Sequence, residues 1–106
     1  MQDIFCNIVE RKEPATIVYE DGLCLAFLDN EPIAEGHSLV IPKKHYESVF
    51  DIPDDELQAV ILAIKAVAKI VKEQYNYKGI SIRQNNGIFQ EIPHVHFHVY
   101  GKNGPL

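Results

Sequence analysis

Several features that would point to particular classes of protein are scarce or absent in this sequence. Its 106 residues contain no tryptophan, one methionine and two cysteines, and 15 acidic residues outnumber the 10 lysines and arginines. A formal charge of −5 without a basic stripe argues against a nucleic-acid polymer as partner, because such partners require cations that displace counterions. A mononucleotide stays open as a ligand, since backbone N–H groups can hold its phosphate.

Long apolar runs are also missing. The longest, GLCLAFL and AVILAI, are far shorter than a membrane span, and the first residues, MQDIFCNIVERKE, carry charges where a secretory signal needs an apolar core. We therefore expect a cytoplasmic protein with no membrane partner, in which Cys6 and Cys24 are reduced. The length and the 46% of apolar residues favour one globular domain over residues 1–106.

Hydrophobic periodicity predicts an α+β fold with a mainly antiparallel sheet. Apolar residues at helical spacing predict a short helix over residues 3–10 and a long helix over 53–76, which we expect to pack on the sheet rather than in a coiled coil. Asp21-Gly22 predicts a two-residue hairpin, and a short helical turn is expected over residues 44–50. Apolar and β-branched runs predict five strands, at residues 16–20, 23–29, 37–43, 79–84 and 94–101.

Three of the five histidines alternate within the last predicted strand, in the run PHVHFHVYG. Residues i and i+2 share a face in a strand, whereas in a helix they point in nearly opposite directions. The run is therefore expected to be extended, with His94, His96 and His98 on one face. The other face would pack in the core through Val95, Phe97 and Val99.

Three interpretations of this histidine face are open. A solvated face is the least favoured, because exposed strands normally carry Thr, Lys, Glu and Arg. A zinc ion could use one His-x-His pair with His37 or His45, but the outer two histidines of the run are ~13 Å apart, too far for both to bind one ion. Nucleophilic catalysis on phosphorus employs all three: one imidazole attacks, while its neighbours fix the reactive nitrogen and assist the leaving group.

The segments IFCNIV, VYEDGLCLAFLD, GHSLVIPKKH, QNNG and PHVHFHV follow one another in this order. With them the chain resembles the histidine triad (HIT) family, most closely its Hint branch of small nucleoside phosphoramidases. The resemblance implies a HIT-like fold with a five-stranded antiparallel sheet and a homodimer whose sheets join into one. It also implies a purine nucleotide or nucleotide conjugate as ligand and no required cofactor.

The resemblance further implies roles for single residues. His96 matches the nucleophile that attacks the α-phosphate and becomes nucleotidylated, His98 matches the histidine beside the leaving group, and His94 orients the triad. His37 matches a fourth histidine of the site, and Asp29 the carboxylate that grips the ribose hydroxyls. The apolar walls of the nucleobase pocket match four residues for which core packing is an equally good explanation, namely Ile4, Phe5, Ile8 and Phe27.

The loop before the histidines departs from the family pattern. Asn85 and Gln90 match the amides around the phosphate, but the loop is about two residues short and places Glu91 where a Ser or Thr contacts the phosphate. A carboxylate 4 Å from a phosphate costs about 4 kcal/mol at an effective dielectric near 20. We therefore predict that the Glu91 side chain turns outward.

A second departure concerns the N-terminus, where related bacterial proteins often carry Cys-x-x-Cys and bind structural zinc together with two histidines. In this chain Asp3 and Cys6 occupy those places, with His45 and His94 as the matching histidines. Zinc is not expected, because a carboxylate replaces one thiolate. The chain also stops at GKNGPL, without the tryptophan-containing tail of animal relatives, so its leaving-group preference is expected to differ.

The resemblance implies a hydrolase that releases a nucleoside monophosphate from a nucleoside 5′-phosphoramidate. The reaction would pass through a nucleotidyl-histidine intermediate. Two alternatives stay open at this point. One is hydrolysis of dinucleoside polyphosphates, as in other branches of the family, and the other is a nucleotide-binding or scaffold protein with weak catalysis.

Overall fold

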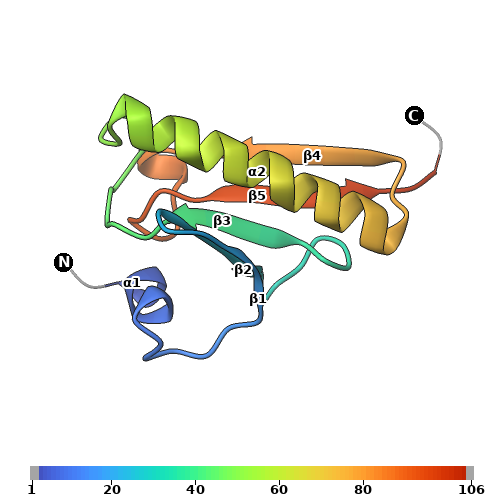
Figure 1. Cartoon of the computed structure of the whole chain (residues 1–106), viewed down its shortest axis with the longest axis horizontal. Coiled ribbons are helices and arrows are strands. Elements are labelled where there is room, and N and C mark those ends of the chain that lie inside the picture. Colours follow the sequence, from blue (N-terminus) through green and yellow to red (C-terminus); the bar gives the residue numbers. More distant parts are fainter. Residues whose placement is uncertain (1–2, 105–106) are drawn as a thin grey trace.

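The computed structural model describes residues 3–104 and contains one five-stranded sheet with a helix on each face (Figure 1). All neighbouring strands are antiparallel, and their order is β1-β2-β3-β5-β4, so that β1 and β4 are the edge strands. This arrangement confirms the predicted α+β class. In chain order the elements are α1 (Ile4–Val9), β1 (Ile17–Glu20), β2 (Cys24–Leu28), β3 (Ser38–Pro42), α2 (Asp54–Tyr75), β4 (Gly79–Gln84), the 3-10 helix η1 (Gly87–Phe89) and β5 (Phe97–Lys102).

Alternation along the central strands divides the apolar side chains between two cores. Strand β3 is buried along its whole length, and β2 at all but its last residue, which explains their apolar sequences. The larger core lies between the sheet and α2, and it includes Cys24, Ala26, Val40, Val60, Ile64, Val67, Val95, Phe97 and Val99. The smaller core lies under α1 on the opposite face, and it consists of Phe5, Ile8, Leu25, Phe27, Leu39 and Ile41.

The long helix α2 is the clearest success of the periodicity argument. Asp54, Asp55 and Glu56 form its first turn, where the positive end of the helix dipole favours acids, and Lys72 lies in its last turn. It ends at Asn76, which has the left-handed φ of 55° that is common at helix ends. Among the described residues no helix is both long and apolar enough to cross a membrane.

Three local predictions were wrong, each because of a hydrogen bond that sequence periodicity does not reveal. Residues 44–50 contain no helix; a turn closes instead, with the Asp51 N–H donating to the Ser48 carbonyl. The β1–β2 loop has three residues, because the Asp21 side chain accepts two backbone N–H groups. Strand β5 begins at Phe97 rather than at residue 94, because the Val95 N–H donates to Tyr46, outside the sheet (2.7 Å).

Candidate active site

The alternation of the histidine run holds even though its first part lies outside the β5 ladder. The three apolar residues of the run pack in the core under α2, as expected. His94 is completely buried, His96 is 8% exposed, and His98 is partly exposed. His96 stands edge-on to Phe5 of α1, with ring centres 5.1 Å apart, and its ring centre is 5.3 Å from that of His98. His94 and His96 therefore contact α1 through Phe5, while His96 and His98 both line a pocket.

Backbone carbonyls determine which nitrogens of two histidines carry a proton. His96 Nδ1 lies 2.8 Å from the carbonyl oxygen of His94, and a carbonyl can only accept, so Nδ1 donates. The neutral His96 ring then keeps a lone pair on Nε2. In the same way, His94 Nε2 donates to the carbonyl of Pro42 at 2.9 Å, which leaves the lone pair of His94 on Nδ1.

His37 and His98 form a second hydrogen-bonded chain. The backbone N–H of Ile33 donates to His37 Nδ1 (3.0 Å), so neutral His37 carries its proton on Nε2, 3.0 Å from His98 Nδ1. His98 consequently accepts on Nδ1 and carries its own proton on Nε2. Burial, followed by the nearby His96 and His37, lowers the pKa of His98 to about 4, and burial also lowers the pKa of His37. The Nε2 lone pair of the neutral His96 tautomer and the Nε2–H of His98 thus belong to neighbouring rings.

A cavity of about 330 Å³ lies beside these rings, between α1 and the sheet. Asp29, at the end of β2, belongs to its lining. One Asp29 oxygen accepts the Glu31 N–H (2.9 Å), and the other lies 3.5 Å from His37 Nε2 and 3.9 Å from His98 Nδ1. The carboxylate therefore caps a turn and faces the site at once. Other residues expected at the site that line the cavity are Ile4, Phe5, Ile8, Phe27, His37, His96, His98 and Glu91.

Two of the expected loop residues are not brought to the cavity. Gln90 bonds both to its own loop and to the segment between β3 and α2: its Oε1 accepts the Gly87 N–H (3.0 Å), and its Nε2 donates to the carbonyl of Glu47 (2.7 Å). Asn85 is not part of the cavity lining, and its carbonyl accepts from the Gln84 side chain. In the described part of the chain these two amides therefore lie outside the lining of the cavity, and their contact with a phosphate stays a prediction. Glu91 is exposed and forms part of the cavity lining.

Arg83 was missed by the sequence argument. It lies in β4 directly opposite His98, lines the cavity, and holds its guanidinium carbon 5.7 Å from the centre of the Tyr100 ring. The available signal was its place at one of the alternate positions of residues 79–84, a strand that pairs with the histidine strand. Also missed were Pro14, Ala15, Leu28, Asn30, Glu31, Ile33, Leu39 and Ile92.

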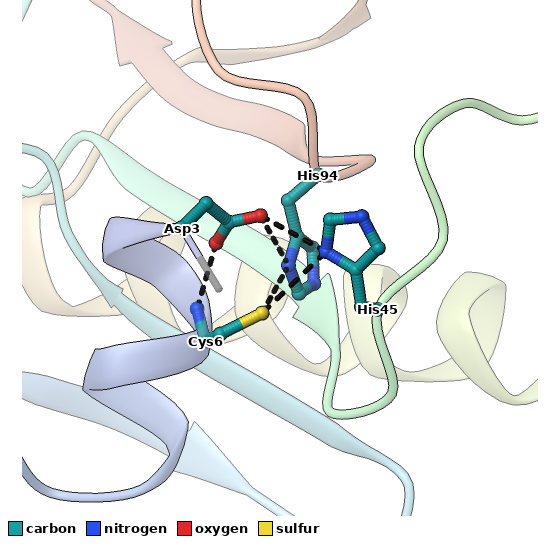
Figure 2. Close-up of side chains that lie close together, drawn as sticks. All are labelled: Asp3, Cys6, His45 and His94. Carbon is teal, nitrogen blue, oxygen red and sulfur yellow. Dashed lines mark hydrogen bonds and ion pairs between the residues drawn. The ribbon is translucent and has the colours of Figure 1, made fainter. Parts of the chain in front are cut away.

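Four further side chains converge next to the site, as Figure 2 shows. Asp3 and Cys6 belong to the start of α1, His45 follows β3, and His94 is the first histidine of the run. Cys6 Sγ lies 3.5 Å from His45 Nδ1 and 3.6 Å from His94 Nδ1. Asp3 Oδ2 lies 3.0 and 3.3 Å from the same two nitrogens, and Asp3 Oδ1 accepts the Cys6 N–H (2.8 Å).

This cluster fits a tetrahedral cation. Zinc bonds of about 2.3 Å to sulfur and about 2.0 Å to nitrogen, at the tetrahedral angle, place the two ligand atoms about 3.5 Å apart. The four atoms in the cluster lie at such separations, all within 4.8 Å of one another. Among the residues that the structure describes, Asp3 Oδ2 is buried without a hydrogen-bond partner, and His94 directs a lone pair at it. Electron-pair donors that converge in this way need a proton or a metal ion between them.

The chemistry of the individual groups agrees with that requirement. Although burial opposes it, the Cys6 N–H and the nearby His94 hold the pKa of Asp3 below its usual value. Burial lowers the pKa of His94, which disfavours a proton on that ring. The Asp3 carboxylate thus takes the place of the missing thiolate, which weakens the argument against zinc.

The histidine face, the covering helix and the strand order together define a known class of protein. The HIT domain family matches residues 10–104, and the chain belongs to this family. An uncharacterized HIT-like protein of Methanocaldococcus jannaschii is 47% identical over 91% of this chain and 75% of its own length. An adenosine 5′-monophosphoramidase of Candida albicans is 38% identical over 93% of this chain and 69% of its own length.

Solved structures agree with this assignment. A HIT family protein from Bacillus subtilis superposes with a TM-score of 0.93 at 34% identity, over 98% of this chain and 75% of that one. A zinc-bound histidine triad family protein from Mycobacterium smegmatis superposes with a TM-score of 0.89 at 34% identity, over 94% of this chain and 74% of that one. The five-stranded HIT-like fold expected from the sequence is thereby confirmed.

Proposed function

We propose that this protein is a nucleotide hydrolase that cleaves nucleoside 5′-phosphoramidates and releases the nucleoside monophosphate. The observation that carries the proposal is the pair of ring nitrogens in the cavity: His96 has a lone pair on Nε2, and the neighbouring His98 has its N–H on Nε2. A nucleophile beside a proton donor is what displacement at phosphorus requires. Relatives named adenosine 5′-monophosphoramidase, in Candida albicans and Saccharomyces cerevisiae, support the same reaction.

In the first displacement His96 Nε2 bonds to the α-phosphorus and the bond from phosphorus to the amine breaks. The bound phosphate favours the imidazolium form of His98, which gives its Nε2 proton to the leaving nitrogen. Asp29 Oδ2, 3.9 Å from His98 Nδ1, adds a negative charge that favours this form. In the second displacement His98 takes a proton from water, the oxygen of which bonds to phosphorus while the bond to His96 breaks.

The remaining walls of the cavity suit a nucleoside. Ile4, Phe5 and Phe27 offer an apolar surface on which a purine ring can lie, and Phe5 and Phe27 already pack edge to face, with centres 5.4 Å apart. The Asp29 carboxylate at the cavity edge offers acceptors for ribose hydroxyls. We infer that base, sugar and phosphate follow one another from α1 towards the histidines.

A test compares adenosine phosphoramidate and a diadenosine polyphosphate as substrates, with AMP release as the measurement. We expect release from the phosphoramidate and a loss of about a thousandfold or more in His96→Asn. Faster release from the polyphosphate would favour the alternative hydrolase. A second candidate, a nucleotide-binding protein with weak catalysis, is favoured by the loop that keeps Asn85 and Gln90 away from the cavity. AMP binding without turnover would establish it.

We infer also that the second cluster binds a zinc ion through Asp3, Cys6, His45 and His94. The fit to tetrahedral separations and the zinc-bound state of the Mycobacterium smegmatis relative support this. Such an ion would tie α1 to the segment that carries the catalytic histidines. We expect about one zinc per chain by elemental analysis, and its loss in Cys6→Ala. Cys24→Ala, a change at the other buried cysteine, should retain the metal; zinc-free wild type with unchanged stability under chelation would contradict the inference.

We propose further that two chains form a homodimer through β4. This strand is at the edge of the sheet, and it exposes Ile82 (54%), while the adjacent α2 exposes Ile61 and Leu62. Open edges with apolar side chains favour pairing with another strand. Light scattering should give twice the mass of the chain, and Ile82→Lys should shift it towards the monomer. A monomeric wild type at micromolar concentration would contradict the proposal.

A further inference from the structure

Arg83 reaches the cavity from β4, the strand beside the histidines. It pairs directly with His98 in the antiparallel ladder, and residues opposite each other share a face of the sheet. Its guanidinium lies over the ring of Tyr100, two residues further along the same face of β5. Because the register of two paired strands fixes this position, Arg83 stands on the side of the cavity where the phosphate chemistry is proposed.

The charge of the cavity makes this position important. The ionised side chains that line it are the carboxylates Asp29, Glu31 and Glu91, with Arg83 as the one permanent cation among the described lining residues. In the part of the chain that the structure describes, Arg83 forms no ion pair that would occupy it. A nucleotide brings a further negative charge into this acidic surrounding. The unpaired guanidinium is therefore the group best placed to offset it.

Two amides that were expected near the phosphate lie elsewhere in the part of the chain that the structure describes. The side chain of Gln90 bonds to Gly87 and Glu47, and Asn85 lies outside the cavity lining. Strand β4 ends at Gln84, and its residue Arg83 lies opposite His98 and lines the cavity. A planar guanidinium can donate two parallel hydrogen bonds to the oxygens of one phosphate, which a single amide cannot.

We propose that Arg83 binds the non-bridging oxygens of the nucleotide α-phosphate from the side of His98. The inference rests on the proposed function, since it names a binding group for the same substrate. In this position Arg83 replaces the amides of the loop, compensates the acids at the cavity edge, and holds the phosphorus in line for His96. The matching ligand chemistry is a nucleoside monophosphate unit rather than a nucleoside.

The test measures binding of AMP and of adenosine by calorimetry to wild type, Arg83→Gln and Arg83→Lys. Lys102→Gln is the matched control, because it removes the same charge from an exposed position of the sheet outside the cavity. We expect Arg83→Gln to weaken AMP binding about 10- to 100-fold. Adenosine binding should change less than about twofold, Arg83→Lys should recover part of the loss, and Lys102→Gln should match the wild type.

Several results would overturn the inference. AMP binding within about threefold of wild type in Arg83→Gln would exclude a phosphate contact. Equal weakening of AMP and adenosine would mean that Arg83 only supports the fold through Tyr100. If Arg83→Gln weakens the binding of substrates with an anionic leaving group but not of AMP, Arg83 contacts the leaving group rather than the α-phosphate. If the wild type binds neither AMP nor adenosine, both the proposed function and the role of Arg83 are wrong. If the wild type binds AMP and Arg83→Gln binds it equally well, only the role of Arg83 is wrong.

Discussion

The buried neutral histidines predict that the fold loses stability in mild acid. His98 is 16% exposed, and burial together with the neighbouring rings lowers its pKa from 6.5 to about 4. The unfolded chain therefore takes up a proton below about pH 6.5, whereas the folded chain takes it up only below about pH 4. His37, the pKa of which burial also lowers, acts in the same direction. The stability contributed by these rings is present above pH 6.5 and is lost as the pH falls towards 4.

The size of the effect follows from the two pKa values of His98. A difference from 6.5 to about 4 corresponds to about 3 kcal/mol when fully expressed. At pH 5 the unfolded state is almost fully protonated and the folded state hardly at all, so about 2 kcal/mol of the unfolding free energy is lost between pH 7 and pH 5. For a protein of ordinary stability this is a large fraction of the total.

Urea unfolding at pH 7, 6 and 5, followed by circular dichroism, measures this loss directly. His98→Asn supplies the control, because a variant without the titrating ring should show a dependence on pH that is weaker by about 2 kcal/mol over the same range. Equal pH dependence of the two proteins would refute the reasoning. So would an NMR titration in which the His98 ring takes up its proton near pH 6.5.

Two further predictions concern the cavity edge and the sheet. Glu91→Gln should change kcat/KM for a phosphoramidate by less than about tenfold if the carboxylate turns outward; a gain of several hundredfold, the equivalent of about 4 kcal/mol, would show that it faces the phosphate. Gly101→Ala should unfold at markedly lower urea than wild type, because a β-carbon there would lie 1.9 Å from the Tyr77 ring, whereas Gly79→Ala, with open space around it, serves as the control. Similar midpoints for the two glycine variants would contradict the packing around Tyr77.

Features that depend on local periodicity could be predicted from the sequence. The 3.6-residue pattern predicted α2 to within one residue at each end, and the alternation of histidines with Val95, Phe97 and Val99 predicted which side chains face the core. Each of these depends only on neighbours along the chain. The family resemblance predicted that Ile4, Phe5 and Ile8 of α1 form walls of the nucleobase pocket, and these residues line the same cavity as His96 and His98.

Features that depend on contacts between distant segments could not be predicted in this way. The start of β5 depends on the Val95 N–H, which donates to Tyr46, and the loop before it depends on Gln90, which donates to Glu47. The place of Arg83 depends on the register between β4 and β5. A residue that the sequence pattern marks as a ligand can thus be occupied elsewhere, while an unmarked neighbour on the paired strand takes the position at the cavity.

The most direct test of the proposed chemistry is to look for a nucleotide bound to His96. The protein is mixed with adenosine phosphoramidate, quenched in alkali within the first turnovers, and digested for mass spectrometry. We predict a peptide that carries one AMP on His96, formed and consumed at the rate of turnover and absent in His96→Asn. Turnover that proceeds without this adduct, or that survives in His96→Asn, would contradict the double displacement.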